Sequence, residues 1–525
     1  MGVKRVLLSV VSFCALFSLA SCDIEVKVKD TTKAGTTTQR TSTTKGTKTG
    51  STSTTRKNTS GSNTSNTTQA VTTQANVGNG EVLNFYCWND EVVYRFRQYY
   101  GDSEKLTDDT DLLSDGTKVK WIMRTIAHDP SDPTSPVYQD YLDAALEEGT
   151  CDLFCFESDY AKKYVDSQYV VDLATLGIDQ SRQFKFTKDV VTNANGKVVG
   201  TAWACCPGVI CYNENIAKLL FDNEDEYSIN AMRLKLNTKE AFDQTAEQLE
   251  NIDSKYAMII GPEDGYRCYT QNLEDKMYNG GTTLTIDKQL FRYMKSMKTY
   301  NTNGYLLGDD YEYYLWSVPW GDCSNAKSNV LTLYSTTWYN DYCIDGYKTI
   351  NNGAVRICEV DQNGSSPWRV VEGYGPNFWG GTWISPTSVG ISNNTKKNAI
   401  KSILSKLTTD KATLRAMSDG TQDFTNNMDA MGEKGTDTSA CNAFFGGQNV
   451  FAVYSASAVN IDAEKMSLYH QQIIEEFQSA FLPYITGSKS ASSCWTTFKT
   501  NLGYKITFTC NAASGVIIDD DITIA

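Results

Sequence analysis

Apolar and polar residues alternate along residues 81–156 in a pattern that predicts strand, helix, strand, helix and strand. EVLNFYCW (81–88), KVKWIMRTI (118–126) and CDLFCF (151–156) are typical of strands, and residues 89–100 and 135–149 have helical spacing. Acidic residues open the first helix, as a helix N-terminus prefers, and Gly149 closes the second. Strands that alternate with helices predict a parallel sheet with both faces covered.

The chain beyond residue 156 continues this mixed α/β pattern. Residues 198–213 form a strand-like passage broken at Pro207-Gly208, which we interpret as a crossing between two lobes. Further strands are predicted at 329–341, which runs into a turn or helix start, and at 382–392. Further helices are predicted at about 237–251, 286–300 and 461–482. The last of these is marked by Met466, Tyr469, Ile473, Phe477 and Phe481. Another helix carries Ala399, Ile400, Ile403, Leu404 and Leu407 on one face. About 445 residues are too many for one core and suit two large lobes.

The N-terminus has the pattern of an export signal. Lys4 and Arg5 precede the uncharged apolar run 6–20, which is too short to span a bilayer comfortably. The run ends in Leu19-Ala20-Ser21-Cys22, which resembles a bacterial lipobox. We therefore predict that residues 1–21 are a signal peptide and that Cys22 receives a lipid. The alternative is an ordinary signal peptide in which Cys22 has no role.

Residues 31–80 consist mostly of Thr, Ser, Gly, Asn and Gln, with few large apolar side chains. Such a segment cannot bury enough surface to offset its ordering entropy. We predict a disordered stalk over residues 22–80, with an end-to-end distance of roughly 40 Å. The triplets at Asn58, Asn63 and Asn66 would be glycosylation acceptors in a eukaryote, so a mucin-like stalk is the alternative.

Charge is divided unevenly along the chain. The net charge is −14, and because residues 1–30 carry +1 and residues 31–80 carry +6, residues 81–525 carry −21. A body this acidic repels nucleic acid and gives no steering to phosphorylated or carboxylated ligands. The charge indicates a neutral or cationic ligand and no nucleic-acid partner.

The cysteines and histidines do not form a recognisable metal or cofactor motif. Of fifteen cysteines, Cys14 leaves with the signal and Cys22 is the lipidation site. Cys151 and Cys155 are too far apart on one strand for a disulfide. No C-x-x-C is present, and the two histidines, His128 and His470, are far apart in sequence. We predict no metal and no cofactor, and mostly buried, apolar thiols, with one or two bridges left open.

Aromatic and polar residues follow most of the predicted strands. Ligands bind beyond the carboxyl ends of parallel strands, so we predict that a ligand contacts these positions. They are Trp88, Asn89 and Asp90; Glu157, Ser158, Asp159 and Tyr160; Trp203 and Tyr212; Asp264 and Tyr266; Trp338 and Tyr339, followed by Asn340; and Trp379 and Trp383.

This combination suits neutral sugars. An aromatic ring covers the apolar C–H face of a pyranose, while carboxylates and amides bind its hydroxyls. The alternative is that some of these rings belong to the core, and for Trp203 and Trp383 the two interpretations are equally open.

Several strings in their order resemble the bacterial extracellular solute-binding lipoproteins of carbohydrate ABC transporters, of the maltose-binding-protein type. They are LNFYCWND, DLFCFESDYAKKYVDS, GTAWACCPGVICYN, LTLYSTTW and WGGTWISPTSVGISNNTKKNAIKSIL, spread over residues 81–407. The resemblance implies a type II periplasmic-binding-protein-like α/β fold with hinge-crossing strands and an interlobe ligand cleft. It places lobe one at about 81–199 and 383–430, and lobe two at about 213–378 and 435–525. The chain departs from the family at Cys205-Cys206-Pro207 and in its tail beyond about 485.

The family's ligand-contacting positions fall on Trp88, Asn89, Glu157 through Tyr160, Trp203 and Trp338. The resemblance implies a non-enzymatic, monomeric protein, lipid-anchored at the extracellular face of the cell membrane. It would capture a neutral oligosaccharide and deliver it to the permease of an ABC importer. Two alternatives are a cell-surface glycoside hydrolase, with Glu157 and Asp159 about 7 Å apart on one strand face, and a glycan-binding adhesin without a permease.

Overall fold

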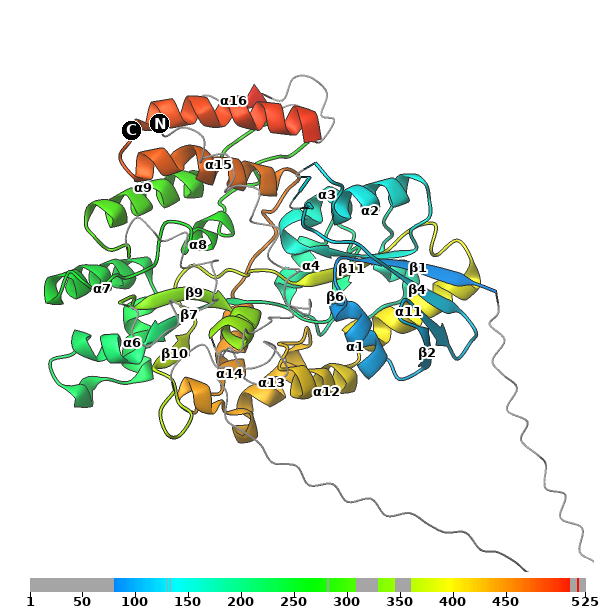
Figure 1. Cartoon of the computed structure of the whole chain (residues 1–525), viewed down its shortest axis with the longest axis horizontal. Helices are drawn as coiled ribbons and strands as arrows, with labels where there is room; N and C mark the ends of the chain where they lie inside the picture. The colour runs from blue at the N-terminus through cyan, green and yellow to red at the C-terminus, as the bar shows by residue number, and fades with distance from the viewer. Residues whose placement is uncertain are drawn as a thin grey trace, which may run out of the picture. The chain divides into compact units, whose positions relative to one another are not determined.

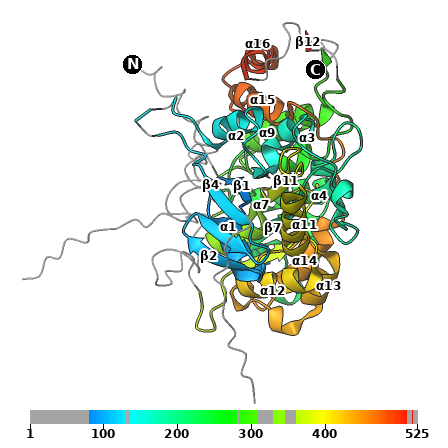
Figure 2. The ribbon, with the colours of Figure 1, turned by 90° about the vertical axis from the view of Figure 1, so that its right-hand side faces the viewer.

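The computed structural model describes residues 80–129, 131–132, 134–280, 283–307, 329–344, 360–509 and 517–518 (Figures 1 and 2). The predicted signal peptide, the lipidation site Cys22 and the stalk up to residue 79 lie outside these residues. Among the described helices, none combines the length and the apolar character that a membrane span requires.

The first sheet has seven strands in the order β2-β3-β4-β1-β5-β11-β6. Their bounds are β1 Val82–Cys87, β2 Ser103–Thr107, β3 Thr110–Leu113, β4 Lys118–Met123, β5 Leu153–Glu157, β6 Thr201–Ala202 and β11 Thr382–Pro386. β1 runs parallel to both β4 and β5, as the strand–helix alternation predicts. The prediction of a parallel sheet holds for β4, β1 and β5 and is wrong for the other strands. β2 and β3 form a hairpin, which is antiparallel by construction, and β11 is antiparallel to β5 and β6.

Helices cover both faces of the first sheet. They are α1 Glu91–Tyr99, α2 Tyr138–Glu147, α3 Ala161–Val165, α4 Lys185–Val190, α11 Asn394–Thr408 and α12 Lys411–Thr421. α2 and α3 lie on one side of the sheet, and α1, α11 and α12 lie together on the other (Figure 1). The apolar stripe predicted from Ala399 to Leu407 is confirmed, since all five of its residues are buried on α11. The side chain of Asn393 caps this helix by accepting from the backbone N–H groups of Thr395 and Lys396.

The second sheet has the order β10-β7-β9 and is antiparallel. Its strands are β7 Gly208–Asn213, β9 Thr332–Thr336 and β10 Trp368–Val371. Side chains alternate between the faces of a strand. Val209 and Cys211 therefore pack in one hydrophobic core, which includes the first sheet, whereas Ile210 and Tyr212 pack in the other. This sheet separates two buried cores.

Helices from two parts of the sequence complete the second half of the body. They are α5 Glu214–Ala217, α6 Ile229–Leu236, α7 Lys239–Ile252, α8 Arg267–Thr270, α9 Lys288–Thr302, α13 Met428–Thr436, α14 Val450–Ala458, α15 His470–Ile485 and α16 Ala491–Thr509, with short strands β8 Thr283–Leu284 and β12 Ile517–Ile518. α14 contacts β7 and β10, and α15 packs between α9 and α16 (Figure 1). Short 3-10 helices lie at Ser158–Tyr160 (η3), Leu173–Leu176 (η4), Lys218–Leu220 (η5), Glu224–Glu226 (η6), Thr438–Ala440 (η8) and Ala443–Phe445 (η9), and a π-helix, η7, at Tyr339–Ile344.

Two predicted elements are shorter than their sequence patterns. The helix predicted at 461–482 begins only at His470, because Tyr469 takes a left-handed backbone conformation with a φ of 68°. The strand predicted at 382–392 ends at Pro386, which has no N–H to donate to a strand ladder. The residues after it form a turn in which the Gly390 N–H donates to the Thr387 hydroxyl.

The first sheet takes its strands from residues 82–202 and 382–386, and the second takes its strands from 208–371. The lobe boundaries implied by the sequence stay predictions. Among the described cysteines, eight are buried and only Cys441 is exposed, which confirms the expectation of mostly buried thiols. Burial raises the pKa of Cys87 to about 12, so this thiol is protonated and inert at neutral pH.

Candidate functional site

The carboxyl ends of several strands meet beside Glu157. β1 and β5 are parallel neighbours. Trp88, which follows β1, and Glu157, the last residue of β5, therefore lie at the same edge of the sheet. β11 runs the other way and pairs Thr382 with Glu157. The antiparallel pairing therefore brings the turn that contains Trp379 and Gly380 to that same edge.

Three aromatic rings form one packed group at this edge. The ring centroids of Trp338 and Trp379 are 4.8 Å apart and nearly perpendicular, and Tyr339 stacks on Trp379 at 5.7 Å. The indole N–H of Trp338 donates to the backbone carbonyl of Trp379 at 3.0 Å. This hydrogen bond fixes the orientation of the partly buried Trp338 ring.

Gly380 allows this close approach. Its φ is +79°, and a Cβ there would lie 3.0 Å from Trp338 Nε1 and 3.8 Å from Glu157 Oε1. Both the backbone conformation and the space exclude a larger residue. The same distances place the Trp338 indole nitrogen and the Glu157 carboxyl group close to one glycine.

A carboxylate–guanidinium pair lies next to Glu157. Arg267 donates from Nη1 to Asp159 Oδ1 at 3.2 Å and from Nη2 to Asp159 Oδ2 at 3.1 Å. The guanidinium also lies over the ring of Tyr266 at 4.9 Å and over that of Trp379 at 5.3 Å. The pair connects η3, which follows a strand of the first sheet, with α8, which packs in the other core.

The two carboxyl groups are shifted in opposite directions. Burial and the negative charge of Asp159 raise the pKa of Glu157 well above its ordinary value, which favours the neutral form. Burial also acts to raise the pKa of Asp159, but Arg267 outweighs it and holds that pKa below its ordinary value. The Asp159 side chain is 32% exposed, so its carboxylate still faces solvent.

Two residues of this group were not predicted from sequence. Arg267 stands beside the predicted Asp264 and Tyr266, and that neighbourhood was the only signal for it. His470, the first residue of α15, lies close enough to Asp159 to interact electrostatically, and burial lowers its pKa to about 4. Its Nδ1 atom is buried without a hydrogen-bond partner.

The residues after β1 lie around a second buried carboxyl group, that of Glu91. Asn89 lies just before α1, and its side-chain oxygen accepts from the Glu91 N–H at 3.2 Å. Burial raises the pKa of Glu91 to about 7, with Arg95 opposing and Asp423 adding to that shift. Arg95 donates to Asp423 at 2.7 and 3.1 Å, which ties α1 to the segment after α12.

The other residues predicted at the ends of β1 and β5 are mostly buried or engaged in contacts within the protein. Trp88 is buried and lies edge-on to Tyr138 at 5.6 Å. Asp90 hydrogen-bonds to Tyr94 and raises the pKa of that phenol. Ser158 is buried and donates to Asp159 at 3.3 Å, and Tyr160 packs on Tyr164.

The structure places three predicted aromatic residues in the packed interior. Trp383 is fully buried and donates to the Thr187 carbonyl at 2.9 Å, and Tyr212 is fully buried with its hydroxyl 3.0 Å from that of Tyr227. Trp203 is buried in the first core, and its indole nitrogen lacks a partner.

Asp264 has a structural role in the interior. It is buried and accepts hydrogen bonds from the backbone N–H groups of Tyr334, at 3.1 Å, and Ile260, at 3.4 Å. Burial raises its pKa to about 7 against these two hydrogen bonds. Asp264 thereby joins β9 to the loop that contains Tyr266 and leads into α8, whose first residue is Arg267.

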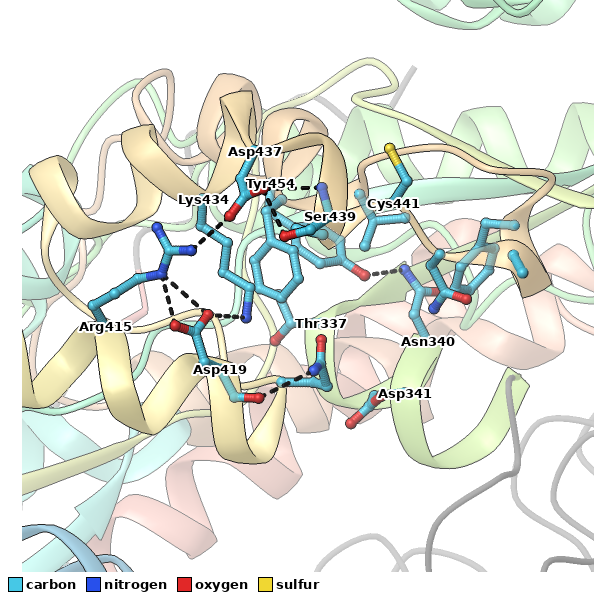
Figure 3. Close-up of a pocket in the computed structure, with 17 residues that line it drawn as sticks. Thr337, Asn340, Asp341, Arg415, Asp419, Lys434, Asp437, Ser439, Cys441 and Tyr454 are labelled. Atoms are coloured by element: carbon cyan, nitrogen blue, oxygen red, sulfur yellow. Dashed lines mark hydrogen bonds and ion pairs between the residues drawn. The ribbon is translucent and has the colours of Figure 1, made fainter.

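A cavity of about 510 Å³ is lined by Thr337 and Asn340, between which Trp338 and Tyr339 lie in the sequence (Figure 3). Of the strand-end residues named from the sequence, Asn340 alone lines it. Its walls come from η7, α12, α13, η8, η9 and α14, and include Thr337, Asn340, Arg415, Lys434, Cys441 and Tyr454. Its volume is in the range of small-molecule sites.

One group of acidic residues has a geometry that could hold a metal ion. Asp189, Asp462 and Glu464 approach one another closely, but the ammonium group of Lys185 pairs with all three, at 2.7, 3.4 and 2.7 Å. The lysine supplies the positive charge that a metal would bring. We therefore assign this group to ion pairing between α4 and the segment before α15.

Comparisons with known proteins give the fold. No protein-family model matches the chain, and no curated protein matches it. Among solved structures, an extracellular solute-binding protein of family 1 superposes with a TM-score of 0.62 at 16% identity, covering 81% of this chain and 99% of that one. An ABC-transporter-associated binding protein from B. animalis subsp. lactis, in complex with beta-1,6-galactobiose, gives 0.52 at 13% identity over 84% and 100%. An ABC substrate-binding protein from Listeria monocytogenes, in complex with cycloalternan, gives 0.51 at 14% identity over 82% and 99%.

These likenesses confirm the predicted fold class. The chain has the two-lobe α/β fold of the extracellular solute-binding proteins.

Proposed function

We propose that the protein captures a neutral carbohydrate, an oligosaccharide, and delivers it to an ABC importer. The observation that carries this proposal is the group formed by Trp338, Trp379, Glu157, Asp159 and Arg267. The partly buried ring of Trp338 is the aromatic surface proposed for a pyranose, and the buried Trp379 packs against that ring and supports it. The carboxyl groups and the guanidinium offer acceptors and donors to hydroxyls. The proposed ligand contacts also include Trp88, Asn89 and Asp90, which follow the neighbouring strand β1.

The charge balance of the site supports a neutral ligand. Asp159 and Arg267 neutralise each other, and the raised pKa of Glu157 favours its uncharged form. A charged ligand would bring an uncompensated charge into a partly desolvated site. The sugars bound in two of the similar structures, beta-1,6-galactobiose and cycloalternan, are neutral and add support by analogy.

A glycoside hydrolase is the second candidate, because Glu157 and Asp159 have pKa values shifted apart. A retaining hydrolase needs such a pair, with a protonated acid and an ionised nucleophile. Here, however, both oxygens of Asp159 accept hydrogen bonds from Arg267, which reduces their nucleophilicity. This arrangement favours binding over cleavage.

We propose in addition that residues 1–21 direct export, that Cys22 carries a lipid and that residues 22–80 act as a stalk. A tether of roughly 40 Å would hold a monomeric binding body near its permease at the outer face of the membrane. Mass spectrometry of the N-terminal peptide from the native host tests the modification. Cys22→Ala is expected to release the protein into the medium, and retention of that variant in the membrane would contradict the anchor.

A screen of neutral oligosaccharides tests the carbohydrate function. Thermal-shift and calorimetric measurements identify the sugar that binds, and chromatography of each mixture shows whether it stays intact. Stabilisation with the sugar recovered intact is the expected result. Cleavage would support the hydrolase, and no response to any glycan would contradict both carbohydrate functions.

A further inference from the structure

His470 lies where the two cores of the protein meet. It is the first residue of α15, which packs in the second core through Ile473 and Phe477. This helix contacts η3, whose Tyr160 packs in the first core, and the first turn of the helix lies beside α3 (Figure 1). His470 is only 7% exposed. The imidazole is therefore enclosed at a contact between segments that belong to different cores.

A protonated His470 would carry an N–H group that finds no acceptor. Its Nδ1 atom is buried and has no hydrogen-bond partner among the described residues. A neutral imidazole has one donor and one acceptor nitrogen, whereas both nitrogens of the imidazolium are donors. Whichever nitrogen carries the proton in the neutral ring, the imidazolium therefore has an unsatisfied N–H at Nδ1 in addition to its buried charge. Both features are costly in the interior of a protein.

The position of His470 in α15 also disfavours a positive charge. The backbone N–H groups in the first turn of a helix have no partners within the helix and carry a partial positive charge. His470 belongs to the first turn of a helix of 16 residues. The imidazolium would face this partial charge, which favours the neutral ring.

Two cations and one anion face His470 from three other elements. Asp159 of η3, Lys162 of α3 and Arg267 of α8 all lie within electrostatic range of the imidazole. The Lys162 ammonium is buried and donates to two backbone carbonyls at 2.9 and 3.0 Å. Burial and nearby Lys276 lower the pKa of Lys162 to about 8, so this group is still charged below neutral pH. Because Asp159 is already paired with Arg267, a protonated His470 would be a third cation beside one carboxylate.

The helices α9 and α16 also pack on α15, but their polar contacts lie further along it. The ammonium of Lys298 on α9 lies over the ring of Tyr484, near the C-terminal end of α15, at 5.6 Å. Asn501 on α16 donates to Glu476 at 2.8 Å. Within the described part of the chain, the charged groups from η3, α3 and α8 are therefore those that act on His470.

These surroundings change the affinity of His470 for a proton. Burial, Lys162 and Arg267 lower its pKa from the ordinary value of 6.5 to about 4, against the opposing effect of Asp159. An arrangement of the lobes that exposes His470 to water would return this pKa towards the ordinary value. The enclosed arrangement thus holds the proton less tightly than the exposed one, so a proton favours separation of the two segments.

We infer that His470 is a proton sensor that couples the pH of the surroundings to release of the ligand. The neutral imidazole fits the contact between η3 and α15, and the imidazolium destabilises it. The inference rests on the proposed function, because it requires two lobes that close over a ligand and separate when the ligand leaves. The contribution of His470 to closure is present above about pH 6.5 and is lost as the pH falls towards about 4.

The small number of histidines allows the titration to be observed directly. The chain has two, His128 and His470, so NMR of the ring Cε1–H groups follows both in protein purified without a histidine tag. The spectrum of His128→Gln assigns the two signals. His470 is expected to titrate near its ordinary pKa of 6.5 in the sugar-free protein and at least about one pH unit lower in the sugar-bound protein. The same pKa in both states would overturn the inference.

Calorimetry measures the consequence for binding. The affinity for the neutral oligosaccharide that binds best is compared between pH 7.5 and pH 5 in the parent and in His470→Gln. Relative to the variant, the parent is expected to lose about tenfold in affinity over this range. His128→Gln is the matched control and should behave like the parent, because the Nδ1 atom of His128 lies 2.6 Å from the Ser135 carbonyl oxygen, away from this contact.

The comparison with His470→Gln removes the effect of other groups that titrate. Glu157 has a raised pKa and would act in the opposite direction, but it is present in both proteins. Circular dichroism at each pH shows whether each protein is folded. Parallel pH profiles of the parent and His470→Gln would overturn the proton sensor alone. If the variant does not fold, the NMR titration of the parent decides.

A different result would overturn the function on which the inference rests. A parent protein that binds no neutral oligosaccharide at pH 7.5 would contradict the carbohydrate function and, with it, the role of His470.

Discussion

Arg267 donates two parallel hydrogen bonds to Asp159, which is 108 positions away in the sequence. Asp159 follows a strand of the first sheet, whereas Arg267 begins a short helix in the second core. Under the proposed function, this pair would join the two lobes at the proposed ligand site. It orients the carboxylate, keeps it ionised and supplies donors of its own.

A double-mutant cycle measures this pair. Arg267→Met, Asp159→Asn and their combination are expected to show a coupling of about 1–2 kcal/mol in urea unfolding, because Arg267 is buried and Asp159 is partly exposed. The exposed pair Arg182–Asp429 is the control, with an expected coupling of about 0.5 kcal/mol or less. Equal coupling in the two pairs would contradict the special role of Arg267.

Replacement of two tryptophans separates binding from stability. Trp338→Ala is expected to weaken sugar binding at least about tenfold, which corresponds to about 1.4 kcal/mol. Trp383→Ala, at a fully buried position, is expected to cost about 3–5 kcal/mol of stability instead. Calorimetry and denaturant unfolding of both variants check this. Parent-like sugar affinity in Trp338→Ala would remove Trp338 from the site.

Gly380 is expected to be essential for the arrangement of the aromatic group. Gly380→Ala adds a Cβ 3.0 Å from the Trp338 indole nitrogen at a positive φ. Gly447→Ala is the matched control, since Gly447 has a φ of +80° but open space around it. Both should lose about 1 kcal/mol from backbone strain. Only Gly380→Ala should also weaken sugar binding, and equal affinities would contradict the assigned geometry.

Asp264 predicts a specific pH dependence of stability. Its pKa is raised from the ordinary value of 3.8 to about 7, so the folded protein holds a proton that the unfolded chain releases between these values. The contribution of this group to stability is therefore present at low pH and is lost as the pH rises towards 7. Between pH 5 and pH 7 the parent should lose about 2 kcal/mol relative to Asp264→Asn. Parallel pH profiles in urea unfolding would contradict the shift.

Sequence patterns predicted the central strands and the residues that follow them. The spacing of apolar residues and the type of residue at the end of a strand can both be recognised from a short stretch of sequence. β1, β4, β5 and the buried face of α11 appear where the apolar spacing indicated. The residues beside Glu157 were likewise accessible from sequence, since parallel neighbouring strands end at one edge. The proposed carbohydrate function could be suggested from the sequence because it rests on these residues at the strand ends.

Other features depend on long-range packing and were missed. The start of α15 is set by the left-handed backbone of Tyr469, which no apolar spacing indicates. Arg267 acquires its role only through a distant partner, and the cavity is assembled from turns and helix ends between residues 337 and 454. For Trp383 the sequence left ligand contact and core equally open, and only packing decides that it is in the core.

Calorimetric titration of the purified protein with its best oligosaccharide, followed by analysis of the sugar, tests whether the protein binds a neutral carbohydrate without cleaving it. We expect saturable binding, recovery of the intact sugar and loss of binding in Trp338→Ala. Cleavage of the sugar, or failure of every neutral oligosaccharide to bind the parent protein, would contradict it.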